Sequence, residues 1–313
     1  MMNTYDFYNP DRDHYAFEEY LQMVHSDQSN VRISAANDLG ISGNPKALAP
    51  LIGLLQDANV EVKARSILAL GLLGEQLHHR IDMKEVTKAV VENINDPDPY
   101  IRCRCVSALG RLGDKSVLDI LINSLHDKNE GVRVCAADSI GWLKVTSTVA
   151  VDNLIQGLGD PNQLVRSSCI KALVLIGQPN VIFDHIVAML KDSDPYVRQD
   201  AATALGNIQQ PGAFNALFQY IQNETDIKPS LAAQALGKLG LQVFDALINK
   251  LSDNDPNIRY WTTIALGYVG DNRAMPYLEK IIEHDVGETR TRAKIVTAAK
   301  KAIKKIAEMN SEM

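Results

Sequence analysis

Apolar residues recur along the chain in a fixed phrase. An apolar residue followed by Arg or Lys is succeeded, eight residues after the apolar position, by a second apolar landmark that usually precedes Gly. The phrase appears as Val31-Arg32 with Leu39-Gly40 and as Ile101-Arg102 with Leu109-Gly110. The second landmarks are residues 39, 70, 109, 140, 173, 205, 236 and 266, spaced by 30 to 33 residues except for one interval of 39. A period of this length indicates a stack of identical supersecondary units.

Each period predicts two amphipathic helices. With the first apolar residue of the phrase as position 0, apolar or small residues fill positions 0, 4, 7, 8 and 11, which is the stripe of a helix with 3.6 residues per turn. Another apolar stripe precedes each phrase, as in Leu118, Leu121 and Leu125. Small residues at position 7 allow close approach between neighbouring helices. Glycines at position 12 are expected to end the helix in a left-handed cap; they are Gly43, Gly74, Gly113, Gly177, Gly240 and Gly270.

The phrases resemble a known family. DPDPYIRCRCVSALGRLGD, DSDPYVRQDAATALGNI and DNDPNIRYWTTIALGYVGD are similar to HEAT repeats of the short kind named after phycobilisome lyases, over residues 15–308. The resemblance and the period together predict an all-α fold, an α-solenoid (superhelix) of about eight to nine HEAT-type helical hairpins. We expect a single solenoid over residues 1–313, with an N-terminal cap and first helix at 1–26, regular repeats at 27–270 and a C-terminal capping repeat at 271–313.

An Asp stands five residues before most phrases, at positions 57, 96, 127, 160, 192 and 253. Together with the Arg at position 1, it supplies one acid and one base per layer. A row of catalytic carboxylates is one interpretation. Because the pair recurs in nearly every layer, we prefer a structural role, in which Asp caps the second helix or binds an Arg of its own or the next layer.

Several segments depart from the repeat. The interval of 39 residues contains an insertion, Glu75 to Glu85, which is expected to be a solvated loop or a longer helix; a metal site at its adjacent His78 and His79 is the alternative. The seventh repeat lacks the layer Arg and carries Pro229, which favours a hinge. Aromatic residues crowd the first twenty positions and lysines mark residues 291–306; both ends are expected to cap the stack.

In HEAT solenoids the phrase-bearing helix lines the concave surface, so positions 3, 6 and 10 are expected to face the groove. Two clusters with the composition of binding hot spots fall there. The predicted groove residues are Arg65, Arg104, Arg111, Trp142, Tyr260, Trp261, Ile264 and Tyr268. The arginines suit carboxylates of an acidic segment and the aromatic residues suit an apolar one; burial against the preceding helix is the alternative for some of them.

Composition excludes some functions. The net charge of −6 disfavours nucleic acid as the main partner. Neither a secretory signal nor an apolar run of membrane-spanning length occurs, so we expect a cytoplasmic protein without membrane insertion. The four cysteines form no CxxC pair, and a chain of 313 residues needs no disulfide, which favours a reducing compartment. Cys105 and Cys169 occupy core position 4, whereas Cys103 and Cys135 lie in adjacent layers, where a thiol site or an iron–sulfur contact is an alternative to simple packing.

The favoured function is a non-enzymatic scaffold or adaptor that holds a partner protein in its concave groove, with no catalytic residues, metal or cofactor. The alternative, implied by the resemblance, is a phycobilin lyase-type (E/F) subunit or chaperone that handles a bilin and a phycobiliprotein. Deoxyhypusine hydroxylase is a HEAT enzyme whose di-iron site uses His-Glu dipeptides, and none of the seven histidines here precedes Glu. The sequence assigns no oligomeric state.

Overall fold

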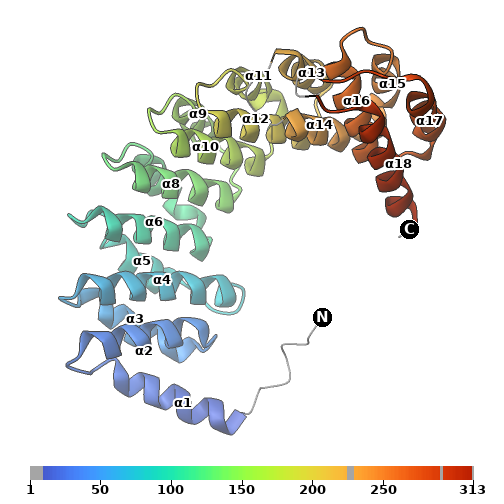
Figure 1. Ribbon diagram of the computed structural model, residues 1–313. Coiled ribbons are helices and arrows are strands. Elements are labelled where there is room, and N and C mark those ends of the chain that lie inside the picture. Colours follow the sequence, from blue (N-terminus) through green and yellow to red (C-terminus); the bar gives the residue numbers. More distant parts are fainter. Residues whose placement is uncertain (1–9, 224–228, 290–291, 312–313) are drawn as a thin grey trace. The chain divides into compact units, whose positions relative to one another are not determined.

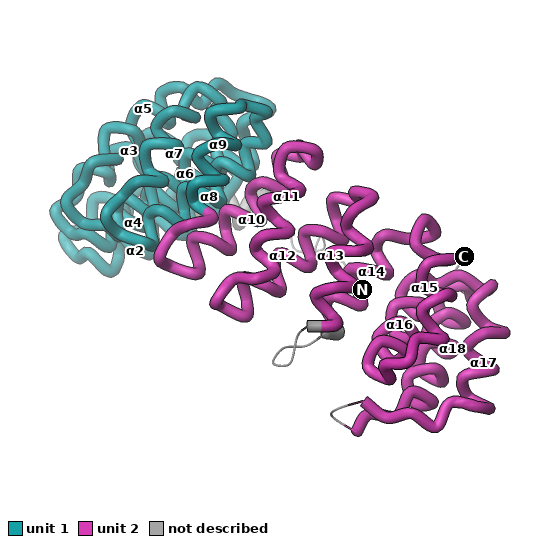
Figure 2. The backbone as a smooth tube through the Cα atoms, turned by 90° about the horizontal axis from the view of Figure 1, so that it is seen from above, with its two compact units in different colours: residues 1–157 teal, residues 158–313 magenta. Residues whose placement is uncertain are grey.

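The computed structural model describes residues 10–223, 229–289 and 292–311. This part of the chain holds eighteen α-helices and no strand, only an isolated bridge between Glu288 and Lys294. The chain divides into two compact units, residues 1–157 and 158–313 (Figure 2). Each unit is a stack of antiparallel helical hairpins, which confirms the predicted all-α solenoid.

Unit 1 contains nine helices. They are α1 (Pro10–Met23), α2 (Ser29–Ile41), α3 (Leu48–Gly53), α4 (Val60–Leu77), α5 (Lys84–Val91), α6 (Pro99–Leu112), α7 (Leu118–Ser124), α8 (Glu130–Leu143) and α9 (Thr148–Gly157). The even-numbered helices carry the phrase and stack on one another in the order α2, α4, α6, α8, as Figure 1 shows. Each of α1, α3, α5 and α7 packs on the even-numbered helix that follows it.

Unit 2 repeats this arrangement. Its helices are α10 (Gln163–Ile176), α11 (Pro179–Met189), α12 (Pro195–Ile208), α13 (Ala213–Asn223), α14 (Pro229–Lys238), α15 (Phe244–Lys250), α16 (Pro256–Val269), α17 (Met275–His284) and α18 (Ile295–Ser311). The even-numbered helices from α10 to α18 stack in order, and α11, α13, α15 and α17 pack beside them. Within the described residues, each unit therefore contains four complete hairpins.

The core consists of the predicted stripe. In the layer whose phrase begins at Val62, for example, positions 0, 4 and 8 are Val62, Ser66 and Leu70, and all three are fully buried. Close packing between layers depends on a glycine at position 9. A Cβ atom on Gly40 would lie 2.7 Å from Cβ of Ala69, and one on Gly110 would lie 2.6 Å from Cβ of Ser139. Position 9 of one helix thus meets the small residue at position 7 of the next, which is the close approach that the sequence predicted.

The position-12 glycines behave as expected in all layers but one. Gly113, Gly177 and Gly270, for example, have φ between 72° and 78° at the ends of their helices. The prediction for Gly74 is wrong, because α4 continues through it to Leu77. The Glu75 to Glu85 insertion therefore begins as an extra turn of α4, and only its second part is a loop, which ends where α5 begins.

Layers are joined by a ladder of ion pairs. Arg102 on α6 donates through Nε and Nη2 to both carboxylate oxygens of Asp127, at 2.8 and 2.7 Å, and through Nη1 to the carbonyl oxygens of Asp96 and Pro97. Asp127 also accepts the backbone N–H of Asn129, whose own side chain caps α8. The repeated Asp therefore binds the Arg of the preceding layer, and the residue two places later is the helix cap.

The same arrangement recurs in both units. The bidentate pairs are Arg32–Asp57, Arg102–Asp127, Arg166–Asp192 and Arg259–Asp285, and Lys63 contacts Asp96 at 3.0 Å. In the Arg102 and Arg166 pairs both side chains are 15% exposed or less. The Arg hydrogen bond is the largest influence that lowers the pKa of Asp57, Asp127 and Asp285. The recurrence assigns these acids to structure rather than to catalysis.

Two sequence predictions fall partly outside the described residues. The hinge expected in the seventh repeat falls on residues 224–228, and the first aromatic residues, Tyr5, Phe7 and Tyr8, precede residue 10. Of the N-terminal aromatics that are described, Phe17 is buried, as a capping role requires.

No single described helix is long and apolar enough to cross a membrane. One bent pair of helical segments, residues 231–238 with 240–250, has the length and apolar composition of a span when the two are taken together.

Candidate functional site

Four of the predicted groove residues come together on unit 1. Arg65 lies on α4, Arg104 and Arg111 on α6, and Trp142 on α8, so that they belong to three successively stacked helices. The guanidinium carbon of Arg111 lies 5.3 Å from the centroid of the Trp142 ring, across the α6–α8 contact. Trp142 is 44% exposed. We call these four residues the basic–aromatic face.

The three arginines of this face differ in their partners. Arg65 pairs with Glu61 one turn earlier, and Arg111 pairs with Glu75, each at 2.6 Å. Arg104 lies over the ring of Tyr100, with 4.9 Å from its guanidinium carbon to the centroid. No carboxylate of the described residues pairs with Arg104. It is therefore the cation of this face that a carboxylate from outside would neutralise.

The sequence did not predict the acids that pair with the other two arginines. Glu61 is the residue before position 0 of its layer, and Glu75 is the first residue of the insertion. Both pairs are solvent-exposed, with 39% and 57% of the Glu side chains accessible. Pairs of this kind contribute about 0–1 kcal/mol, so a competing carboxylate can replace either acid at small cost. The Glu61–Arg65 pair could have been predicted from its helical spacing of four residues. No sequence pattern indicated the Glu75–Arg111 pair.

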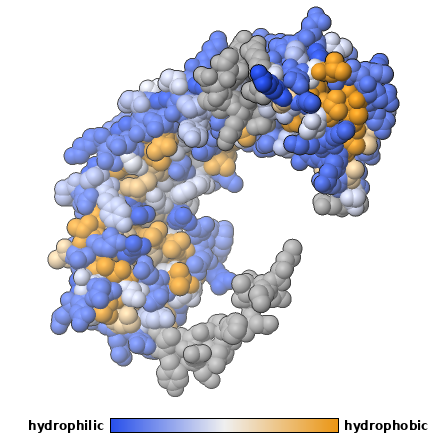
Figure 3. Space-filling model, viewed as in Figure 1, coloured by the Kyte–Doolittle hydropathy of each residue, from blue (hydrophilic) through white to orange (hydrophobic). Residues whose placement is uncertain are grey.

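An apolar row accompanies the arginines at position 10. Ile41 on α2 is 70% exposed, Leu72 on α4 is half-buried, and Trp142 occupies the same position on α8. Figure 3 shows hydrophobic side chains interrupting a largely polar surface over α4 and α8. Ile41 and Leu72 occupy this position on adjacent helices, and Arg111 of α6 separates them from Trp142. We call the three apolar side chains the position-10 strip; exposed apolar side chains gathered in this way are typical of interaction surfaces.

Cys103 and Cys135 form a disulfide between α6 and α8, next to Arg104 in sequence. Their Cα atoms are 5.8 Å apart. The sequence did not predict this bond, which forms because stacking brings position 2 of one layer opposite position 3 of the next. A bonded pair leaves neither sulfur as a thiolate, so the alternative of a thiol or iron–sulfur site there does not fit this form of the protein. Cys105 and Cys169 are buried, as predicted, and burial raises the pKa of the Cys105 thiol to about 12.

The other four predicted groove residues lie together on α16 in unit 2. Tyr260 and Trp261 contact each other edge to face, with centroids 4.7 Å apart. Trp261, Ile264 and Tyr268 follow one face of the helix at helical spacing, and all four residues are half-buried. Lys305 of α18 covers the Tyr268 ring, with its amino group 4.3 Å from the centroid. The cluster is therefore partly accessible and not packed in the core.

Clusters of metal-ligating side chains are absent from the described residues. No group of three or more His, Cys, Asp or Glu side chains is arranged to hold a metal ion. The rings of His78 and His79 lie close together at the end of α4, with centroids 3.6 Å apart and planes tilted by 47°, and both side chains are exposed. Between α10 and α12, Asp200 accepts from Ser167 and pairs with Lys171 at 3.1 Å, while Lys171 also donates to Ser167. An ammonium ion-paired in this way is a donor and not a base for Ser167, so the trio is a link between layers.

Comparison with known proteins supports the repeat assignment. A family model described as HEAT repeats matches residues 15–79, 87–173, 151–228 and 227–298. Deoxyhypusine hydroxylase of Eremothecium gossypii is 26% identical over 219 residues, which cover 69% of this chain and 65% of that enzyme. The match thus spans slightly less than two thirds of the relative's length.

Solved structures with similar folds have low sequence identity. One chain of a Kap95:Nup1 complex aligns with a TM-score of 0.62 and 14% identity, over 93% of this chain and 45% of that chain. YibA of Escherichia coli aligns with a TM-score of 0.50 and 19% identity, over 97% and 99%. A chain of the complex of CpcE and CpcF of phycocyanin lyase from Nostoc sp. PCC7120 aligns with a TM-score of 0.48 and 21% identity, over 81% and 93%. These likenesses concern the fold.

Proposed function

Because the chain belongs to the HEAT-repeat family, we propose that it is a non-enzymatic scaffold that holds a partner protein against the basic–aromatic face of α4, α6 and α8. The observation that carries this proposal is Arg104, a cation on that face that has no carboxylate partner among the described residues. Farther along the same face lies Trp142, an exposed indole whose ring is covered on one side by Arg111. Trp and Arg are the residues most enriched at the energetic centres of protein interfaces.

The chemistry of the face favours an acidic segment that also carries apolar side chains. A carboxylate of the partner would pair with Arg104 and displace Glu61 or Glu75 from the neighbouring arginines, exchanging one exposed ion pair for another. Apolar side chains of the same segment would lie along the position-10 strip of Ile41, Leu72 and Trp142. The aromatic cluster of α16 is proposed as a further contact for an apolar segment of a partner.

Charge reversal tests the proposal most directly. We expect the Arg65→Glu/Arg104→Glu protein to lose capture of the partners that the wild type recovers from the source cell, because acidic segments would then meet two added negative charges. The matched control is Lys300→Glu/Lys301→Glu, which makes an equal change in net charge at exposed positions of α18. Recovery of the same proteins by the wild type and both variants would remove the basic–aromatic face from partner binding.

The aromatic contacts are tested separately. Trp142→Ala and Trp261→Ala should each weaken binding of the captured partner about tenfold or more, as truncated interface anchors do. Helicity by circular dichroism should change little, because both indoles are partly exposed. A large fall in melting temperature for Trp261→Ala would instead assign this side chain to the packing of α16.

A further inference from the structure

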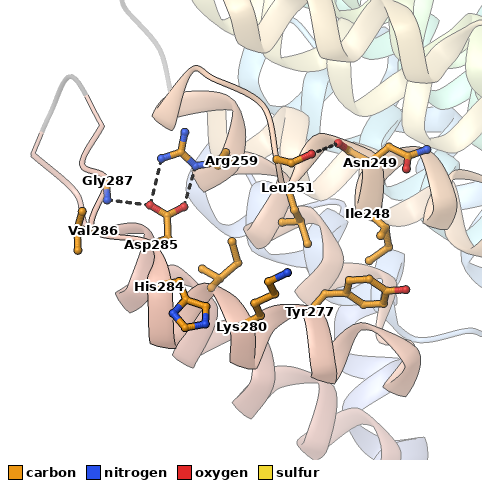
Figure 4. Close-up of a pocket in the computed structure, with 12 residues that line it drawn as sticks. Ile248, Asn249, Leu251, Arg259, Tyr277, Lys280, His284, Asp285, Val286 and Gly287 are labelled. Atoms are coloured by element: carbon orange, nitrogen blue, oxygen red, sulfur yellow. Dashed lines mark hydrogen bonds and ion pairs between the residues drawn. The ribbon is translucent and has the colours of Figure 1, made fainter.

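A cavity of about 620 Å³ opens between α15 and α17 in unit 2 and involves none of the predicted groove residues. Its walls are the facing sides of the two helices, closed at one end by the segment that follows α17 (Figure 4). The volume lies within the range of small-molecule sites in proteins, about 300–1,000 Å³. In Figure 3, hydrophobic side chains gather on the surface over this region.

The cavity has an apolar floor. Ile248 and Leu251 contribute from α15 and its end, and Ile281 contributes from α17. Val286, which is 96% exposed, stands at the closed end, and Tyr277, which is 48% exposed, stands at the opposite end. An apolar surface of this shape binds a hydrocarbon chain by removing it from water.

One of the charged side chains that line the cavity has no ion pair within the described residues. Arg259 and Asp285 neutralise each other through two hydrogen bonds of 2.7 and 3.1 Å, and Gly287 N–H donates to the same carboxylate. His284 at the rim contacts Glu283. Lys280 has no carboxylate partner in the described part of the chain, and Figure 4 shows its amino group directed into the space between Leu251 and Tyr277.

We propose that this cavity binds an amphipathic monocarboxylate, with its hydrocarbon chain along Ile248, Leu251 and Ile281 and its carboxylate on Lys280. The bound carboxylate supplies a negatively charged partner for the Lys280 ammonium. The Tyr277 hydroxyl is available at the same end as a neutral hydrogen-bond donor. The chain would displace only water from the apolar floor. The cavity and the basic–aromatic face share no residue, so a substitution in one leaves the side chains of the other in place.

The test compares three ligands of equal chain length: dodecanoate, dodecanol and dodecyltrimethylammonium, each below its micellar concentration. With ¹³C-methyl-labelled isoleucine, dodecanoate should shift the methyl signals of Ile248 and Ile281 and leave those of Ile101 and Ile140 in unit 1 unchanged. Dodecanoate should bind at least tenfold more tightly than dodecanol, because its carboxylate forms a charge-assisted hydrogen bond with Lys280 that the alcohol cannot form. Equal affinities for the anion and the alcohol, or tighter binding of the cation, would overturn the proposal.

Two variants complete the experiment. Lys280→Met keeps the apolar stem and removes the charge, so it should reduce the preference for dodecanoate over dodecanol to near parity while the Ile248 and Ile281 signals still respond to dodecanol. Lys300→Met, an exposed lysine of α18 outside the cavity lining, should retain the wild-type preference. Circular dichroism confirms that both variants are folded. A Lys280→Met protein that keeps its preference for the carboxylate would refute the assignment of Lys280.

Discussion

Two kinds of arginine stand close together on α6. Arg102 has a 9% exposed side chain and all three of its guanidinium nitrogens donate hydrogen bonds, so it is part of the framework. Arg104, two residues later, points to the opposite side of the helix, and within the described residues its guanidinium interacts with the Tyr100 ring and hydroxyl alone. Residue type alone does not distinguish them. The position within the phrase does, because position 1 binds the Asp of the next layer, whereas Arg104 at position 3 is partly exposed.

Removal of Asp127, an acid of the ion-pair ladder, should lower the free energy of unfolding far more than removal of Glu61, which pairs with Arg65 of the basic–aromatic face. Asp127→Ala leaves the mostly buried Arg102 without its bidentate partner, and we expect it to lower the free energy of unfolding by about 2 kcal/mol or more. Glu61→Ala breaks the exposed pair with Arg65 and should cost less than about 1 kcal/mol. Urea unfolding followed by circular dichroism measures both. Equal losses would show that the ladder pair contributes no more than a surface pair.

At the scale of the helix, the distance between layers is set by pairs of small residues. Position 9 of one even-numbered helix faces position 7 of the next so closely that a single added methyl group would overlap backbone atoms, as it would for Gly110 against Ser139. Bidentate Arg–Asp pairs cross the same layer contacts. A helix in this stack therefore tolerates few changes on its packed face and many on the face with positions 3, 6 and 10.

Gly110→Ala tests this packing against intrinsic helix propensity. Alanine is the better helix former by about 1 kcal/mol, but the new Cβ would lie 2.9 Å from the Ser139 Cα atom and 2.6 Å from its Cβ. We expect a net destabilisation of about 1–3 kcal/mol, typical of overpacking. In the control Gly53→Ala, on α3, nothing lies within 4 Å of the added methyl group, so stability should stay constant or rise. A stabilised Gly110→Ala protein would contradict the close approach of α6 and α8.

The disulfide between α6 and α8 provides a second test at this scale. It closes a loop of 32 residues, for which the chain-entropy estimate of stabilisation is about 3–4 kcal/mol. The Cys103→Ser/Cys135→Ser protein should therefore have a lower melting temperature than the oxidised wild type, and a reductant should lower only the wild-type value. Peptide mapping without reduction should recover Cys103 linked to Cys135, with Cys105 alkylated only after unfolding. Alkylation of Cys103 in the native, unreduced protein would contradict the link.

At the scale of the whole molecule, the repeated carboxylates couple stability to pH. The usual pKa of an aspartate side chain is 3.8, and hydrogen bonds from arginine lower the pKa of Asp57, Asp127 and Asp285 in the folded chain. The unfolded chain therefore binds more protons in acid than the folded chain does. These pairs contribute their full stability at any pH above the pKa that the aspartates have in the unfolded chain. That contribution is lost as the pH falls through the lower pKa values of the same aspartates in the folded chain.

We predict that the melting temperature is nearly constant from pH about 7 to about 5 and falls steeply below about 4. The decline should be shallower in an Asp127→Asn protein, which starts from lower stability and has one fewer proton to take up. Differential scanning fluorimetry across the pH series measures both curves. Superimposable slopes for the wild type and the variant would show that Asp127 does not contribute to the acid sensitivity.

Much of the fold was predictable because the same pattern of apolar, small and charged positions occurs in nearly every repeat. The eight landmarks, the stripe of positions 0, 4 and 8 and the terminal glycines identified the helices and the core, and the family model confirms the HEAT repeats over most of the chain. The prediction for Gly74 failed because the insertion behind it continues α4 for one more turn. The roles of the predicted groove residues in partner binding remain predictions, although four of the eight do share one surface.

What the sequence determined by itself was everything that repeats locally: the helices, their buried stripes, and the acid and base available in each layer. Only the tertiary structure decided which groups meet across layers. It joined Arg102 to Asp127, bonded Cys103 to Cys135, and opened the cavity beside Lys280. It also left Arg104 without a carboxylate partner from the part of the chain that is described. The physical reason is range: helix periodicity acts over a few residues, whereas ion pairs, disulfides and cavities depend on distances between side chains of different hairpins.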